Sequence, residues 1–347
     1  MPPTQPPLSS ILSPLICGTA TFNNQYNPDA SLIPCNTIIH RALTLGVHAF
    51  DTSPYYGPSE SLLGTALAQP SIITSHPRHT YQILTKVGRI GASEFDYSPE
   101  WVRYSIQRSL ARLHATYLDV VYCHDVEFVT PAEVLLAVCE LRRLRDEEGT
   151  VKYIGISGYP VPLLCELAEL VLAETGEPLD AVMSYANFTL QNTALATAGL
   201  GRLRRAGVSC VPNASPLGMG LLRSRGVPVG GKGDFHPAPI ELRGKVAQAA
   251  RYAARKGYKL ETVAIRWALE TWAREGATLG GVGGLGISVM GVSNLEELEE
   301  TMRVYSSVLD GLPVVGRSVE EEKKAWSGAR RKDIEDMAKV LERVMSI

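Results

Sequence analysis

Residues 48–60 read HAFDTSPYYGPSE, a short apolar run that ends at Asp51 and leads into a turn with two adjacent tyrosines. The short run and the Gly-Pro pair after it predict a strand that stops at Asp51. An aspartate at such a position is typical of turn chemistry, because its carboxylate bonds to nearby backbone N–H groups. The rest of the chain therefore decides whether Asp51, Tyr55 and Tyr56 have a chemical role.

Short apolar runs of this kind recur along the sequence, with segments of helical periodicity between them. The runs cover 15–18, 48–51, 81–87, 118–124, 153–157, 181–185, 208–211 and 287–292. Eight strands that alternate with helices are the number that closes a parallel (β/α)8 barrel, the TIM barrel. The alternative is a doubly wound open sheet, but no GxGxxG motif follows the first run. We predict an α/β fold of the barrel type.

Two helix starts can be recognised in the sequence. Thr130-Pro131-Ala132-Glu133 has the pattern of a capping box, and Ser98-Pro99-Glu100 is a weaker version of it. The helix predicted after Ser98 carries one apolar stripe, made by Val102, Ile106, Leu110 and Leu113.

The chain of 347 residues is long enough for one large barrel, and we expect a single domain over residues 1–347. Within it we expect a Pro-rich N-terminal tail over 1–12 and a C-terminal helical extension over 318–347. The segments 226–239 and 274–286 are predicted loops. GVGGLG (281–286) is similar to a phosphate-binding glycine loop, but it precedes a strand, which favours a flexible connection.

Basic and acidic side chains nearly cancel, with 34 Lys and Arg against 36 Asp and Glu. The chain therefore lacks the broad positive field that attracts nucleic acid or an anionic membrane, and we expect a small-molecule partner. The N-terminus has neither a basic region nor a long apolar segment, and the six scattered cysteines form no CxxC pair. These features predict a cytoplasmic protein with reduced thiols and no metal site, and they carry no signal for its oligomeric state.

Charged and polar side chains stand at the ends of three successive predicted strands. Asp51 ends the second strand, Lys86 lies near the end of the third, and His124 near the end of the fourth. The carboxyl ends of barrel strands converge on one face, so the buried aspartate and lysine predict an ion pair. Tyr56 follows on the adjacent loop, where an ammonium group lowers the pKa of a phenol and makes it a usable acid or base. Each residue alone has an ordinary structural explanation, but together they indicate an active site.

These motifs resemble those of the aldo-keto reductase superfamily, and the resemblance covers almost the whole chain. The motifs that carry it are DTSPYYG (51–57), LTKVG (84–88), DVVYCHD (119–125), GISG (155–158), SPLGMGLL (215–222) and MGVSNLEELEE (290–300). The resemblance implies a catalytic tetrad of Asp51, Tyr56, Lys86 and His124. It also implies that Tyr55 lines the substrate pocket and that His124 binds the substrate.

The resemblance further implies a nicotinamide cofactor and assigns the nicotinamide end of its site. Gly18 and Thr19 match the family's Gly-Thr pair after the first strand, beside Asp51. Ser157 matches the serine of the Ser-Asn pair that holds the carboxamide, whereas Gly158 stands where the asparagine is usual. This chain therefore lacks one of the two side-chain contacts to the carboxamide that the family pattern implies.

Further along the chain, Tyr185 stands at the position of the family's glutamine, and Ala214 at that of a ring-stacking tyrosine. Because Ala214 has no ring, Tyr185 is the candidate for the aromatic side chain that stacks on the cofactor ring. Ser215 and Leu217 are similar to the loop that wraps the pyrophosphate, although an ordinary Ser-Pro turn explains this stretch equally well.

The last predicted strand bears on the choice between NAD and NADP. Gly291, Ser293 and Glu297 belong to the cofactor site that the resemblance implies, and family members that prefer NADP usually carry Lys or Arg where Ser293 stands. Glu297, Glu299 and Glu300 follow in the next two helical turns and crowd this region with negative charge. We therefore predict NAD as the cofactor, with NADP as the alternative. The alternative role of Glu297 is a capping box with Asn294.

Within the superfamily, the segments CGTATFNNQYN, GISGYP and SYANFTLQNTAL look most like the D-arabinose 1-dehydrogenase and L-galactose dehydrogenase group. This resemblance implies an enzyme that oxidises the anomeric carbon of a free aldose to an aldonolactone. Two alternatives stay open: a general NADPH-linked reductase of aldehydes and ketones, and a regulatory barrel subunit with low turnover.

Overall fold

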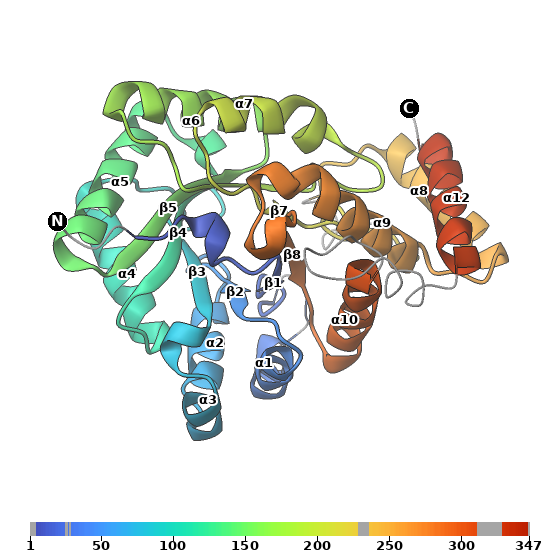
Figure 1. Ribbon diagram of the computed structural model, residues 1–347, viewed down its shortest axis with the longest axis horizontal. Coiled ribbons are helices and arrows are strands. Elements are labelled where there is room, and N and C mark those ends of the chain that lie inside the picture. Colours follow the sequence, from blue (N-terminus) through green and yellow to red (C-terminus); the bar gives the residue numbers. More distant parts are fainter. Residues whose placement is uncertain (1–4, 25–26, 28, 228–235, 311–327, 346–347) are drawn as a thin grey trace.

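The computed structural model describes residues 5–24, 27, 29–227, 236–310 and 328–345, and its parallel strands close into a barrel (Figure 1). Neighbouring strands pair in chain order, and the last strand pairs with the first. The strands are β1 (Leu15–Gly18), β2 (Ala49–Asp51), β3 (Gln82–Val87), β4 (Leu118–His124), β5 (Val151–Gly158), β6 (Ala181–Tyr185), β7 (Asn213–Ala214) and β8 (Ser288–Gly291). The predicted (β/α)8 TIM barrel is confirmed.

One strand differs from its prediction. The predicted bounds agree with the structure for β1, β4 and β6, and for β2, β3, β5 and β8 they differ by one or two residues at an end. The prediction of a seventh strand over 208–211 is wrong, because β7 begins at Asn213. Pro212 has no N–H to donate to a strand ladder, and Cys210 forms an isolated bridge to Ala181. Regular pairing therefore begins after the proline.

Helices surround the barrel (Figure 1), and the two predicted helix starts, at Ser98 and Thr130, are confirmed. They are α1 (Cys35–Thr44), α2 (Ser59–Leu67), α3 (Pro70–Ser75), α4 (Pro99–Leu113), α5 (Pro131–Arg143), α6 (Val161–Thr175), α7 (Leu200–Arg205), α8 (Ile240–Arg255), α9 (Leu260–Glu275), α10 (Leu295–Asp310) and α12 (Gly328–Met345). Ser98 caps α4, and Thr130 and Glu133 form the predicted capping box of α5. The apolar stripe of α4 packs into the core through Val102, Ile106, Leu110 and Leu113.

Apolar side chains fill the barrel interior and close its base. The base is the end at which the strands begin. Leu8, the first residue of a short 3-10 turn (Leu8–Ser10), and Leu12, just after it, are fully buried there and pack in one cluster with Ile16 and Ile287. The segment predicted as an N-terminal tail is therefore part of the core from Leu8 onward, because these two leucines fill the lower end of the barrel.

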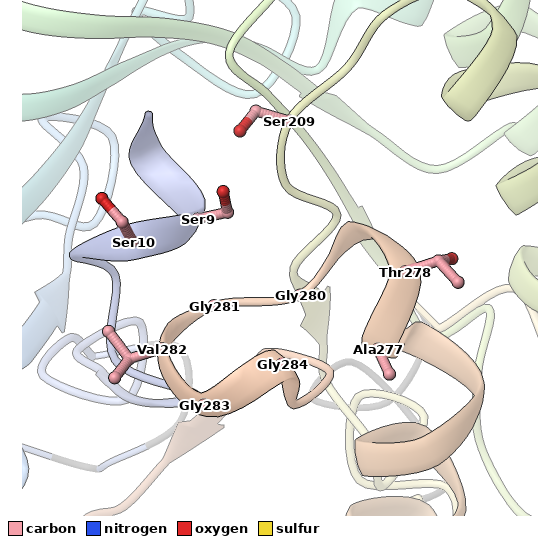
Figure 2. Close-up of a pocket in the computed structure, with 10 residues that line it drawn as sticks. All are labelled: Ser9, Ser10, Ser209, Ala277, Thr278, Gly280, Gly281, Val282, Gly283 and Gly284. Carbon is pink, nitrogen blue, oxygen red and sulfur yellow. The ribbon is translucent and has the colours of Figure 1, made fainter. Parts of the chain in front are cut away.

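The glycine-rich segment before β8 packs against the same base (Figure 2). Val282 N–H donates to Leu12 O at 3.0 Å, and a Cβ on Gly281 would collide with that same carbonyl oxygen. A Cβ on Gly286 would collide with the backbone of Trp272, so close packing requires these glycines. An open hollow of about 390 Å³ lies beside the segment, lined by Ser9, Ser10, Ser209, Ala277, Thr278, Gly280, Gly281, Val282, Gly283 and Gly284. The predicted flexible connection is therefore a packed part of the base.

The C-terminal helix α12 packs on α8 and α9, at one side of the barrel (Figure 1). Its buried side chains are Met337, Ala338, Leu341 and Met345, which meet Leu242, Val246, Leu260 and Val263. Parts of three predicted segments lie outside the described residues: 1–4 of the tail, 228–235 of the long loop, and 318–327 and 346–347 of the C-terminal extension.

Two further observations concern the predicted environment of the chain. All six cysteines are free, as predicted, and all are buried except the exposed Cys139. Within the described part of the chain, no helix is long and apolar enough to cross a membrane.

Candidate active site

A buried ion pair joins the carboxyl ends of β2 and β3. Lys86 Nζ lies 2.7 Å from Asp51 Oδ1 and donates to Thr52 O at 2.8 Å. The two side chains are only 2% and 6% exposed, so each charge depends on the other. Burial raises the pKa of the Asp51 carboxyl, and the Lys86 ammonium acts in the opposite direction. The predicted ion pair is confirmed.

Tyr56 and His124 lie next to this ion pair. Lys86 Nζ is 4.8 Å from the centroid of the Tyr56 ring, and the His124 ring meets that ring edge-on with centroids 5.7 Å apart. His124 Nδ1 lies 3.1 Å from Ser53 Oγ, which itself accepts a hydrogen bond from Tyr55 N–H. The Ser53 hydroxyl can therefore donate to Nδ1, and in that tautomer the proton of the neutral imidazole is on Nε2, which faces the Asp125 carboxylate.

Burial keeps the His124 imidazole neutral. It lowers the pKa of His124 to about 3, although the nearby Asp125 carboxylate acts in the opposite direction. Among the described residues, Nε2 has no hydrogen-bond partner, and it faces Asp125 Oδ2 at 3.6 Å. The imidazole can therefore offer an N–H to a ligand over a wide pH range.

A second buried ion pair, which we did not predict, lies beside His124. Arg89 pairs with Asp125, whose side chain is only 4% exposed. The Arg89 guanidinium lies 3.9 Å from the centroid of the Tyr55 ring and donates to Tyr55 OH at 3.1 Å. Asp125 follows His124 directly in the motif DVVYCHD. This position next to a candidate catalytic residue is the feature of the sequence that could have indicated a role for Asp125.

The positions assigned to the nicotinamide end of the cofactor site meet at the ends of β1, β2 and β8. Gly18 pairs with Asp51 on one side and with Gly291 on the other. Thr19 is fully buried, and its hydroxyl donates to Asp51 O at 2.9 Å and lies 2.6 Å from Ser59 Oγ. The Thr19 side chain therefore joins the ends of β1 and β2. A Cβ on Gly18 would lie 3.1 Å from Val289 and one on Gly291 would lie 3.1 Å from Thr21, so these glycines allow the strand ends to pack closely.

The positions assigned to the carboxamide lie at the ends of β5 and β6. Ser157 is buried, and a Cβ on Gly158 would collide with Glu127 Oε2. Glu127, which we did not predict, therefore occupies the space that an asparagine at 158 would need. Its Oε1 accepts a hydrogen bond from Tyr159 N–H at 2.9 Å and lies 3.5 Å from Tyr185 OH. Burial raises the pKa of Glu127.

Tyr185 lies on the strand beside Ala214, the position of the family's stacking tyrosine. It pairs in register with Ala214 of β7, and its ring lies 5.5 Å from that of Tyr159. The structure therefore brings an aromatic side chain to the strand next to Ala214.

Ser215 and Leu217 belong to the loop that follows β7. Ser215, Gly218 and Met219 adopt left-handed conformations, with φ of 55°, 57° and 53°. Such turns direct backbone N–H groups to one side of a loop and create a concave surface for an anion. Gly218 N–H donates to Ser215 O at 2.8 Å, so the loop is a tight turn, and its contact with a pyrophosphate stays a prediction. Within the described residues, no cluster of His, Cys, Asp and Glu side chains could hold a metal ion.

Ser293 and Glu297 lie together at the start of α10. Glu297 Oε2 accepts a hydrogen bond from Ser293 N–H at 2.8 Å, and Asn294 Oδ1 accepts one from Glu297 N–H at 2.9 Å. Glu297 therefore caps the helix, which was the alternative to a cofactor role. Arg223 Nη1 lies 3.8 Å from Glu297 Oε1, so a cation that we did not predict stands near this carboxylate.

The expected crowd of three carboxylates at Ser293 is not present. Glu299 accepts a hydrogen bond from Arg41 of α1 at 2.9 Å, and Glu300 accepts one from Thr262 of α9 at 2.9 Å. Because residues on successive faces of a helix point in different directions, these two glutamates meet neighbouring helices. Glu297 is the one of the three that contacts Ser293.

The barrel and the residues at its mouth define a class of enzyme, and comparison with known sequences agrees with it. The sequence model of the aldo/keto reductase family matches residues 14–311. The chain therefore belongs to the aldo/keto reductase family, and it is an oxidoreductase that acts on CH–OH groups with a nicotinamide cofactor.

Individual relatives narrow the comparison. The chain is 45% identical over 299 residues to D-arabinose 1-dehydrogenase of Saccharomyces cerevisiae (strain ATCC 204508 / S288c), a match that covers 86% of this chain and 84% of the relative. It is 32% identical over 279 residues to L-galactose dehydrogenase of Arabidopsis thaliana, which covers 78% of this chain and 83% of that relative. A match to probable aldo-keto reductase 1 of Glycine max is 33% identical and covers 55% and 52% of the two chains.

Proposed function

We propose that the chain is an NAD-linked sugar dehydrogenase that oxidises the anomeric carbon of a free aldose to an aldonolactone. The observation that carries the proposal is the contact of Lys86 with both Asp51 and Tyr56, beside the edge of the His124 ring. Two relatives named for D-arabinose and L-galactose support an aldose as the substrate.

Tyr56 is the proposed general acid–base. Oxidation at the anomeric carbon removes a proton from its hydroxyl and a hydride from the carbon. Tyr56 takes the proton, and a bound nicotinamide supplies the hydride acceptor. The Lys86 cation, 4.8 Å from the Tyr56 ring centroid, favours the phenolate that this role requires. Asp51 holds Lys86 in place through the ion pair.

His124 is the proposed binding group for the oxygen on the anomeric carbon. Its neutral imidazole donates from Nε2, while Ser53 holds Nδ1. A neutral donor stabilises the oxygen without placing a second positive charge beside Lys86. Tyr55, whose ring lies 6.0 Å from that of His124, lines the pocket.

NAD is the proposed cofactor, with NADP as the alternative. The neutral Ser293 provides no cation for a 2′-phosphate, and the Glu297 carboxylate at Ser293 N–H repels one. Arg223 lies 3.8 Å from Glu297 and offsets part of this repulsion. We therefore expect a preference for NAD of about fivefold, since charges in partly exposed sites contribute about 1 kcal/mol.

Initial rates with D-arabinose, L-galactose and L-fucose, each with NAD and with NADP, test the proposal. We expect lactone formation, followed by NMR, and a higher kcat/KM for an aldose with NAD than for simple aldehydes with NADPH. Aldehyde reduction without aldose oxidation would instead identify a general carbonyl reductase. Cofactor binding without turnover in either direction would identify a binding barrel.

A further inference from the structure

Asp125 has an unusual backbone conformation for a buried acidic residue. It follows directly on β4, with φ of 55° and ψ of 57°, in the left-handed region that non-glycine residues seldom adopt. Such conformations persist where the surroundings enforce them, and they are common at ligand sites. Asp125 is also 3% exposed, so the fold holds a buried carboxylate in a conformation that Asp and Asn adopt more readily than other non-glycine residues.

Arg89 holds the Asp125 carboxylate in place. Its guanidinium pairs with Asp125 Oδ2 and stacks on the Tyr55 ring, and it lies 5.5 Å from Phe95 and 5.8 Å from Phe128. Three aromatic rings therefore restrict the cation that fixes the carboxylate. Among the described residues, Asp125 Oδ1 has no hydrogen-bond donor. One oxygen of the carboxylate is thus anchored and the other can still accept a hydrogen bond.

The carboxylate lies next to the proposed binding position of the anomeric oxygen. His124 Nε2 and Asp125 Oδ2 are 3.6 Å apart, which is too far for a strong direct hydrogen bond. An oxygen bound at Nε2 would therefore place the neighbouring groups of a sugar ring beside Asp125. Those neighbours are the ring oxygen, which only accepts hydrogen bonds, and the hydroxyl on the next carbon, C2, which donates. A carboxylate attracts the donor and repels the acceptor.

We propose that Asp125 binds the C2 hydroxyl of the aldose and that Arg89 is the positioning residue that holds Asp125 for this contact. The inference rests on the proposed function, because it requires a sugar oxidised at its anomeric carbon. It adds a requirement that the tetrad alone does not impose: the substrate must carry a hydroxyl donor next to the reacting carbon. It also gives the pocket a means to fix which face of the sugar meets Tyr56.

The test compares a sugar with its 2-deoxy form in the wild-type protein and in Asp125→Asn. For D-arabinose the 2-deoxy form is 2-deoxy-D-ribose. Asparagine tolerates the left-handed conformation, so the backbone of the variant stays unstrained. In the wild type we expect loss of the C2 hydroxyl to lower kcat/KM by about tenfold to a hundredfold, the usual value of a hydrogen bond to a charged group. In Asp125→Asn we expect a loss of similar size with D-arabinose and almost no change with the 2-deoxy sugar.

Asp119→Asn is the matched control. Asp119 lies at the other end of the same strand, where it pairs with Arg78 at 2.6 Å. This variant loses a buried Arg–Asp pair at the base, so we expect lower thermal stability and an unchanged ratio between the two sugars. Arg89→Met should lower kcat/KM for D-arabinose as Asp125→Asn does. Arg89→Lys should keep part of the wild-type kcat/KM, because the cation is retained.

The outcomes separate this inference from the proposed function. If the wild type oxidises D-arabinose but Asp125→Asn lowers kcat/KM for both sugars by the same factor, Asp125 acts on the fold or on His124, and the inference is overturned while the proposed function stands. If the wild type oxidises no aldose, both are overturned. If another aldose gives the highest kcat/KM, the same comparison is made with its 2-deoxy form.

Discussion

The two ends of the barrel are built from opposite kinds of side chain. At the mouth, where the strands end, Lys86 of a buried ion pair and a neutral histidine contact Tyr56, and a second, partly buried ion pair contacts Tyr55. At the base, Leu8 and Leu12 fill the barrel and glycines allow the backbone of 280–286 to pack against them. Buried charges cost free energy and apolar burial gains it, so the base stabilises the fold while the mouth carries the reactive groups.

The difference between the ends predicts how the molecule responds to substitution. Changes at the mouth should act on rate and ligand preference, and changes at the base should act on the free energy of unfolding. Each of the following predictions tests this division, beginning with the largest expected effect.

The largest expected effect is on Tyr56. Tyr56→Phe keeps the ring and removes the hydroxyl, so kcat for the aldose should fall by about two to four powers of ten, the usual contribution of a general acid–base. The dissociation constant for NADH, measured by fluorescence, should barely change. A variant that kept more than a few per cent of the wild-type kcat would assign proton transfer to another group.

Lys86→Met should affect both rate and stability, because it breaks the buried ion pair with Asp51. The unpaired carboxylate should lower the free energy of unfolding by about 3–5 kcal/mol. The pH–rate limb of the proton-transfer group should move upward, since the cation that favours the phenolate is lost. Adding Asp51→Asn should recover stability without activity. Loss of activity with an unmoved limb would reduce Lys86 to a positioning residue.

Leu12→Ala tests the base. Leu12 is fully buried, and removing its side chain should lower the free energy of unfolding by about 2–5 kcal/mol. Urea unfolding measures this loss, and kcat and KM below the transition should stay at wild-type values. Leu32→Ala is the matched control. Leu32 is 79% exposed, so this variant should have the same free energy of unfolding as the wild type. A changed kcat in folded Leu12→Ala would contradict the division between the two ends.

His124 should contribute to stability in a pH-dependent way. Its folded pKa of about 3 lies below the ordinary value of 6.5, so as the pH falls the unfolded chain binds the proton first. The contribution is complete above pH 6.5 and is lost as the pH falls toward 3, by about 1.4 kcal/mol per unit at most. Urea unfolding of His124→Gln over this pH range should show a smaller loss of unfolding free energy than that of the wild type. Parallel curves for the two proteins would mean that folding does not lower the pKa of His124.

The smallest expected effect concerns cofactor preference. Ser293→Arg should shift the ratio of NAD to NADP dissociation constants toward NADP by about tenfold, because a guanidinium binds phosphate in a bidentate manner. Glu297→Gln should shift it in the same direction by a smaller factor. Glu299→Gln should leave it unchanged, since Glu299 pairs with Arg41. A wild-type protein that binds NADP more tightly than NAD would show that Arg223 already serves the phosphate.

The sequence alone determined the barrel and showed which two residues, Asp51 and Lys86, form the ion pair at its mouth. Eight apolar runs and their spacing predict the barrel, because strand and helix periods are local properties of the chain. Asp51 and Lys86 could be paired in advance because parallel strands end on the same face. The catalytic role of Tyr56 and the assigned cofactor contacts stay predictions, since geometry alone does not measure turnover or binding.

Only the tertiary structure decided which charges meet across distant segments. Arg89 with Asp125, Arg223 with Glu297, and Glu127 in the space beside Gly158 each depend on loop conformations that periodicity does not encode. The start of β7 after Pro212 and the burial of Leu8 likewise follow from hydrogen bonding and packing with residues far away in sequence. The local pattern of the chain determines its elements, and contacts between elements determine the charges that a substrate meets.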